Sequence, residues 1–141
     1  VNIQDEITLP EISEIVSQYA SIQEVRSKLV VLQRKMSEKY NVIMDGRDIG
    51  TVVLKDSKFK FFLTATPEER ARRRFTELVN RGIDVNYDKL LEDIIKRDYI
   101  DSHREVDPLK KADDAIEIDS SNYNINEVTE IICNFIENAL Q

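Results

Sequence analysis

The 141-residue sequence has few of the residues that cross-link or interrupt small proteins: three glycines, three prolines, one cysteine and no tryptophan. A single cysteine excludes an internal disulfide, and because Cys133 lies in the apolar run EIICNFIENAL, we expect it to be buried. The low glycine and proline content excludes low-complexity and collagen-like chains. A hydrophobic share of 41% and a charged share of 33% instead predict one soluble globular domain with its own core.

Long hydrophobic runs are also missing. No segment approaches the roughly 20 apolar residues that cross a bilayer, and no signal-peptide pattern opens the chain, so we expect a cytoplasmic protein without a membrane partner. Positive charge is in deficit, and the net charge of −7 argues against nonspecific binding to nucleic acid. Because the first residue is Val1 rather than methionine, we expect a piece of something longer.

Apolar residues at alternating steps of three and four predict two N-terminal helices, over 10–20 and from 22 to about 40. Three later helices begin with an N-cap residue: Thr66, followed by Pro67 and Glu69; Asn86; and Asn124, followed by Glu127. The first and the last of these caps have the spacing of a capping box. We expect the apolar stripe of each helix to be buried.

Three short apolar runs lie between or beside these helices: VIMD at 42–45, KFFLT at 60–64 and AIEID at 115–119. They are too short for helices, and the intervening helical segments favour a parallel sheet over a meander. The run TVVLKDSK after the first of them predicts a turn or a short edge piece. The expected fold class is therefore α/β, a parallel sheet with flanking helices.

Polar residues follow the first predicted strand at once, in the stretch NVIMDGRDIGTVVL. A sheet often presents its chemistry at the carboxyl edge of its strands. Asp45 is interpreted either as a turn former or as a carboxylate that orients a substrate or associates with Mg²⁺.

Two groups of arginines stand out against the acidic background. Arg97, Asp101 and Arg104 lie at i, i+4 and i+7 and share one helix face, either as a solvated ion-pair ladder or as part of an anion site. Arg70, Arg73 and Arg74 share a face of the preceding helix. Because the planar guanidinium pairs well with phosphate, two such clusters beside the loop containing Gly82 favour phosphoryl transfer, in which positioning and charge neutralisation do most of the work.

Four stretches of the sequence are similar to those of a known family: VSQYASIQEVRSKLVVLQRKM, VIMDGRDIGTVVL, FFLTATPEERARRR and RGIDVNYDKLLEDIIKRDYIDSHREVDPLKKADDAIEIDSS. With them the chain resembles the bacterial cytidylate kinases, from about Ile12 to the end. This resemblance implies a parallel sheet of the P-loop nucleoside monophosphate kinase type, and phosphoryl transfer from ATP to CMP or dCMP. Residues 1–40 would form part of the monophosphate-binding insert, and 41–141 the core domain with a lid near 70–86.

The resemblance also implies roles for individual residues. Ser17 and Arg26 would contact the cytosine ring and its surroundings, while Arg47 and Asp48 would line the acceptor pocket, with Asp48 hydrogen-bonded to the sugar. Asp101 would also reach the sugar, whereas Arg97 and Arg104 would meet phosphates and act in catalysis. Arg73 would be a catalytic lid residue near the donor phosphates, accompanied by Arg70 and Arg74. No metal ligand is assigned, although the full-length enzyme uses ATP and Mg²⁺.

Two departures from the family pattern bear on this interpretation. His103 stands where another polar residue is usual, and we expect it to be exposed rather than catalytic. The phosphate loop G-x-x-x-x-G-K-[ST] does not occur, since none of the glycines, Gly46, Gly50 and Gly82, precedes Lys-Ser or Lys-Thr. We therefore expect the C-terminal portion of a cytidylate kinase, inactive alone and able to bind CMP weakly. It would self-associate or pack loosely, whereas the parent would be a monomer.

Other functions remain open at this point. The chain would alternatively be a noncatalytic nucleotide-binding or protein-interaction module that works in this short form. Within the kinases, an enzyme for another small acceptor such as UMP or shikimate is the near rival.

Overall fold

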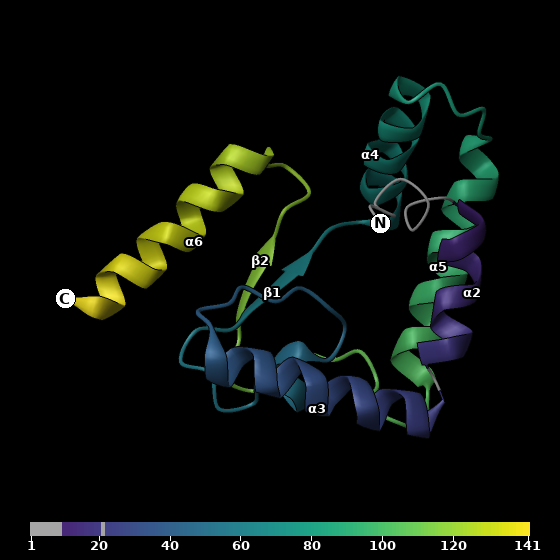
Figure 1. Cartoon of the computed structure of the whole chain (residues 1–141). Coiled ribbons are helices and arrows are strands. Elements are labelled where there is room, and N and C mark those ends of the chain that lie inside the picture. Colours follow the sequence, from purple (N-terminus) through teal and green to yellow (C-terminus); the bar gives the residue numbers. More distant parts are fainter. Residues whose placement is uncertain (1–9, 21) are drawn as a thin grey trace.

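A computed structural model describes residues 10–20 and 22–141, except for the side chains of Pro10, Glu11, Ser13, Glu14 and Ser17. Figure 1 shows its helices and strands, which are, in chain order, α2 (Pro10–Ala20), α3 (Gln23–Lys39), the π-helix η1 (Ile49–Val53), β1 (Phe61–Thr64), α4 (Pro67–Asn80), α5 (Tyr87–His103), β2 (Ile116–Asp119) and α6 (Ile125–Leu140). The predicted α/β class is confirmed at this level, as a small parallel sheet with helices.

The sheet consists of β1 and β2, which pair in parallel from Phe61 opposite Ile116 to Thr64 opposite Asp119. The ladder continues beyond the strands, because the Ile116 N–H donates to the Lys60 carbonyl at 2.9 Å and the Ser120 N–H to the Thr64 carbonyl at 2.8 Å. Helices α4 and α5 form the crossover that a parallel connection requires. Both carboxyl ends therefore meet at one edge of the sheet.

The first predicted strand, at 42–45, is wrong for this structure. Within the part of the chain that is described, this segment pairs with no other strand, and Ile43 is fully exposed. A short apolar run becomes a strand only where a neighbour supplies ladder hydrogen bonds. Asp45 accordingly follows an irregular segment and is exposed. The next run, TVVLKDSK, was predicted to be a turn or edge piece, and it forms the end of η1 followed by a turn at 55–56.

The helix starts follow the predicted caps. Thr66 Oγ1 accepts from the Glu69 N–H at 3.2 Å, and Asn86 Oδ1 from the Lys89 N–H at 2.9 Å. Asn124 and Glu127 form the complete reciprocal box. At Thr66 the box is only half formed. The Thr66 N–H donates to Ser121 Oγ at 3.1 Å, and the Glu69 carboxylate accepts hydrogen bonds from arginines of α4 instead.

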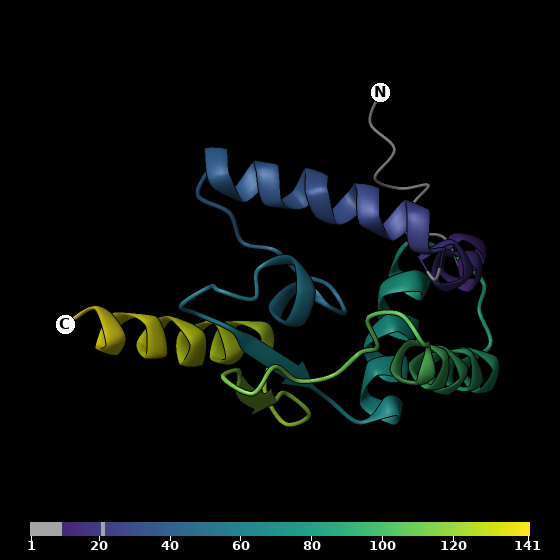
Figure 2. The ribbon, with the colours of Figure 1, turned by 90° about the horizontal axis from the view of Figure 1, so that it is seen from below.

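The helices lie on two sides of the sheet. In both views α6 is on one side and the packed pair α4 and α5 on the other, with α2 against α5 (Figures 1 and 2). Figure 2 shows η1 between α3 and the sheet. On α3, Arg34 donates from Nε to the Val53 carbonyl at 3.0 Å and from a terminal nitrogen to the Val52 carbonyl at 2.5 Å. Arg34 thus satisfies carbonyls at the end of η1 and ties that helix to α3.

The core of the described region is small. Its buried apolar residues are Val53, Ala71, Leu78 and Ile118. The accessible surface is 10503 Å², against about 7500 Å² for a compact 16.4 kDa chain. The expectation of buried helix stripes is wrong for many apolar side chains of α2, α3 and α6, such as Ile15, Leu32 and Phe135, and for Ile95 of α5.

Cys133 shows the same exposure, so the prediction that it is buried is wrong. The apolar period of α6 is present, but its side chains at Val128, Ile131, Ile132 and Ile136 are only half-buried, and Phe135 is exposed with an edge-on contact to Phe61, at 6.4 Å between ring centroids. Periodicity reports which side chains share a face and does not report whether another element lies against that face. No helix of the described region is both long and apolar enough to cross a membrane.

One ion pair, between a buried lysine and an exposed carboxylate, joins the two loops that precede β1 and β2. Lys60, whose side chain is 6% exposed, places Nζ 2.6 and 2.9 Å from the two carboxylate oxygens of Asp114, and it also donates to the Lys55 carbonyl. The hydrogen bond from Lys60 lowers the pKa of Asp114 below its ordinary value. The pair therefore holds the amino ends of both strands together.

Removing either partner of this pair is expected to have unequal effects. Asp114→Ala leaves a buried ammonium without its carboxylate and lowers Tm at pH 7 more than Lys60→Met, which keeps the apolar stem and leaves Asp114 in water. Because the folded pKa of Asp114 is lowered, its contribution is present above the unfolded pKa and is lost as pH falls through the folded one. The deficit of Asp114→Ala should therefore shrink below about pH 4 in thermal melts. Equal losses for both variants at pH 7 would contradict this assignment.

Candidate functional site

The candidate site is built around one buried carboxylate. Asp101, in the last turn of α5, is 2% exposed. Its Oδ2 accepts from Arg47 Nε at 3.0 Å and lies 3.7 Å from Arg97 Nε, while its Oδ1 lies 3.8 Å from a terminal nitrogen of Arg104. Arg47 comes from the loop before η1, 54 residues earlier in the chain. The structure therefore brings arginines of separate segments to a single acid.

Arg47 and Arg97 have the more exposed side chains of the three. Their side chains are 41% and 34% exposed, against 7% for Arg104. Burial lowers the pKa of Arg97, and the neighbouring charge of Arg47 lowers it further. Arg97 Nε is buried and has no hydrogen-bond partner among the described residues. Two adjacent cations with only one acid between them are stabilised by an anion, since it offsets their repulsion and supplies acceptors.

Arg26 of α3 is held differently, because protein groups occupy all three of its nitrogens. It is 6% exposed. Its Nε donates to Asp107 Oδ2 at 3.0 Å and one terminal nitrogen to the Ala20 carbonyl at 3.2 Å, while the other forms a short ion pair with Asp48. Arg26 therefore fixes Asp48 in the wall of the site.

Arg104 caps α5 and turns toward the same loop. Its Nε and one terminal nitrogen donate to the Asp107 carbonyl at 2.7 and 2.5 Å. Burial lowers the pKa of Arg104, and the charge of Arg26 lowers it further. Around Asp101 the structure thus gathers Arg26, Arg47, Arg97 and Arg104 with Asp48, Asp101 and Asp107, four cations against three acids. These seven side chains together carry one net positive charge.

Asp107 is the site residue that the sequence reasoning missed. Its only signal in the sequence is an acid before Pro108, which predicts a turn and says nothing of contacts to arginines. The contacts depend on how the loop after α5 folds back, with the Leu109 N–H donating to the Asp101 carbonyl at 2.7 Å.

The three arginines of α4 have separate protein partners. Arg70 forms a forked pair with Asp98 of α5 at 2.9 and 2.5 Å, and its hydrogen bonds to Asp98 raise its pKa. Arg74 pairs with Glu77 at 2.7 Å.

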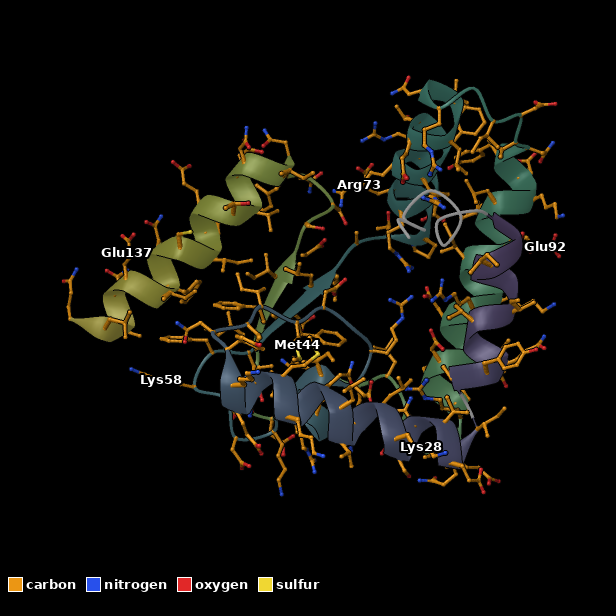
Figure 3. All side chains as sticks on the ribbon, viewed as in Figure 1. Lys28, Met44, Lys58, Arg73, Glu92 and Glu137 are labelled. Carbon is orange, nitrogen blue, oxygen red and sulfur yellow. The ribbon has the colours of Figure 1, made fainter. Side chains whose placement is uncertain are left out.

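Arg73 pairs with Glu69 at 2.8 Å and donates to the Ser120 carbonyl at 2.5 Å and to Ser120 Oγ at 3.1 Å. Figure 3 shows Arg73 reaching from α4 toward the turn after β2, at the carboxyl edge of the sheet. The three arginines share a helix face, yet their guanidinium groups point to three different places.

Other predicted positions are less informative. Ser17 lies in α2, but its side chain is outside the described residues. His103 is exposed, as predicted, and stacks on Tyr99 with ring centroids 4.1 Å apart. Within residues 10–20 and 22–141, no group of three His, Cys, Asp or Glu side chains lies together as a metal site would require.

The fold and the site define an α/β protein with a cluster of arginines built on a buried acid. Comparison with known sequences agrees, because a family model described as cytidylate kinase matches residues 1–138. The chain belongs to the cytidylate kinase family.

Named relatives are close in sequence. The chain is 65% identical over 136 residues to a cytidylate kinase of Clostridium perfringens, 60% identical over 139 residues to that of Clostridium acetobutylicum, and 54% identical over 136 residues to that of Clostridium botulinum. These matches cover 96%, 99% and 96% of this chain and 63%, 64% and 63% of the relatives. The chain thus spans less than two thirds of the length of the curated relatives it matches.

If Arg47 and Arg97 form an anion site, inorganic phosphate should stabilise the chain. At ten times its Kd, phosphate binding contributes about 1.4 kcal/mol, which raises Tm by about 4 to 5 °C. Arg97→Gln should abolish most of this rise in thermal melts with and without phosphate. Arg72→Gln is the matched control, because Arg72 is 66% exposed on α4 and pairs with Glu69. The same rise in both variants would exclude Arg97 from the site.

Proposed function

We propose that this chain supplies the acceptor-nucleotide site of a cytidylate kinase, which transfers a phosphoryl group from ATP to CMP or dCMP and gives CDP or dCDP. The observation that carries the proposal is the convergence of Arg47 and Arg97 on buried Asp101, with both side chains partly exposed and Arg97 Nε lacking a hydrogen-bond partner among the described residues. This arrangement offers paired donors to a phosphate beside an acceptor for a hydroxyl. A nucleoside monophosphate presents these two groups a few ångströms apart.

The geometry suggests a division of work between the site residues. Arg47 and Arg97 bind the acceptor phosphate, and Arg104 adds positive charge from its buried position. Asp101 accepts a hydrogen bond from the sugar while it holds the arginines in place. Asp48, fixed by Arg26, also lines the pocket and contacts the sugar, and Arg26 and Ser17 lie toward the cytosine. Binding of this kind orients the attacking oxygen for in-line transfer.

The donor side of the reaction involves the lid near 70–86, with Arg73 and, less centrally, Arg70 and Arg74. To meet ATP phosphates these arginines must exchange their present acidic and carbonyl partners for phosphate oxygens. Gly82 follows α4 at φ 74°, a conformation that glycine adopts without strain, and it suits a bend at the lid. When bound, Mg²⁺ neutralises charge on the transferred phosphate, and we assign it no ligand in this chain.

The domain boundaries, oligomeric state and activity of the chain alone belong to the same proposal. Residues 1–40 belong to the monophosphate-binding insert and 41–141 to the core domain. The chain alone is inactive, since it has no glycine-rich phosphate loop in its sequence. It self-associates through its exposed apolar helix faces, whereas the whole protein is a monomer. Sedimentation of the chain at several concentrations measures the association, and a coupled assay for CDP measures the activity.

Titration with CMP tests the proposed site directly. Backbone amides of Ser17, Arg47, Asp101 and Arg104 should shift at millimolar CMP, and cytidine should move the arginine signals less because it lacks phosphate. Arg97→Gln should weaken CMP binding about tenfold, as expected for a lost charge-assisted hydrogen bond. Arg72→Gln should leave the affinity unchanged. An absence of shifts at these four positions would refute the acceptor site, and equal affinity for UMP or AMP would refute its assignment to cytidine nucleotides.

A further inference from the structure

Asp107 has an unusual backbone conformation. Its φ is 47°, and it is the non-glycine residue with positive φ in the described region. Aspartate tolerates this left-handed conformation better than most residues, but it still costs free energy, and the following Pro108 restricts the backbone further. A strained residue of this kind persists where surrounding contacts hold it, often at a functional site.

The contacts that hold Asp107 lead to two arginines of the candidate site. Its carboxylate accepts from Arg26 Nε at 3.0 Å, across 81 residues of sequence. Its carbonyl accepts two hydrogen bonds from Arg104, at 2.7 and 2.5 Å. A single residue thus joins α3, which carries Arg26, to the end of α5, which carries Arg104.

An ordinary surface turn does not account for these contacts. The Asp107 side chain is only 29% exposed, and both arginines that it contacts have side chains no more than 8% exposed. The loop is also fixed to the centre of the site, because the Leu109 N–H donates to the Asp101 carbonyl at 2.7 Å. The left-handed turn directs the carbonyl and the carboxylate of Asp107 to two different partners.

We propose that Asp107 is a positioning residue of the acceptor site. Its carboxylate sets the orientation of Arg26, and through Arg26 that of Asp48. Its carbonyl sets Arg104 beside Asp101. The consequence for a ligand rests on the proposed function, with a pyrimidine nucleoside monophosphate as the ligand, whereas the contacts themselves can be tested without any ligand.

The two contacts can be separated by substitution because one uses the side chain and the other the backbone. Asp107→Asn keeps an oxygen acceptor and a residue that tolerates positive φ. Asp107→Gly keeps the backbone conformation easily but removes the contact with Arg26. Asp107→Ala removes the side chain and also disfavours the conformation that presents the carbonyl to Arg104. Glu105→Gln, an exposed acid in the same loop, is the matched control for a change in charge.

The first experiment follows the Nε–H signals of the arginines by NMR in the ligand-free chain. The Arg26 signal should exchange slowly with solvent in the unaltered chain and in Glu105→Gln, remain partly protected in Asp107→Asn, and exchange at least tenfold faster in Asp107→Gly. The Arg104 signal should stay protected in Asp107→Gly and lose protection in Asp107→Ala. Unchanged protection of Arg26 in Asp107→Gly would overturn the proposal, even if Tm falls.

The second experiment measures CMP affinity for the same variants. Asp107→Gly should bind CMP about five- to tenfold more weakly, the loss expected when a charge-assisted contact no longer fixes Arg26 and Asp48. Asp107→Asn should recover most of the affinity, and Glu105→Gln all of it. Equal CMP binding by Asp107→Gly and the unaltered chain would overturn the positioning role. If the unaltered chain binds no CMP, the proposed function fails, while the proton-exchange result still decides whether Asp107 orients both arginines.

Discussion

The burial of the Asp101 carboxylate is the constraint on which the site depends. A carboxylate that is 2% exposed is tolerated in a fold only where cations and donors replace its lost hydration. Arg47, Arg97 and Arg104 supply that replacement from two segments of the chain, so the position of α5 and that of the loop before η1 are coupled through one acid. The pairing is unequal, because the Arg104 side chain is nearly buried while those of Arg47 and Arg97 are partly exposed. This inequality separates the part of the cluster that supports the structure from the part available to a ligand.

Local sequence signals predicted correctly those features of the structure that depend on neighbouring residues. The caps at Asn86 and Asn124, the bounds of α3 and the common helix face of Arg97 and Asp101 all depend on residues within a few positions of one another, and the structure has them as predicted. Arg104 was predicted on the same helix face, but it is the extended C-cap residue of α5 and still approaches Asp101. The predicted strand at 42–45 failed because a strand depends on a distant neighbour. The prediction for Cys133 failed for a related reason, since α6 has the expected apolar period but its stripe is only half-buried in the described region, and Cys133 is exposed.

The candidate site was predictable in part for the same reason. Motif spacing indicated which arginines and acids belong together, but it did not indicate their partners. Arg26 pairs with Asp48 and Asp107, and Arg73 with Ser120, through contacts that span 22 to 81 residues. Asp107 was missed because its role depends on a left-handed backbone turn and on a loop folded against Asp101. Propensity rules describe such a residue only as part of a turn.

The π-helix η1 adds a mechanical property to this arrangement. Arg34 donates to carbonyls at the end of η1, while Arg26, two turns earlier on α3, forms an ion pair with Asp48 at the start of η1. The two attachment points are about 12 Å apart along a straight helix. Because α3 is attached to η1 at two separate points, α3 cannot rotate about either point alone. A tilt of α3 therefore moves Asp48 and η1 together with it.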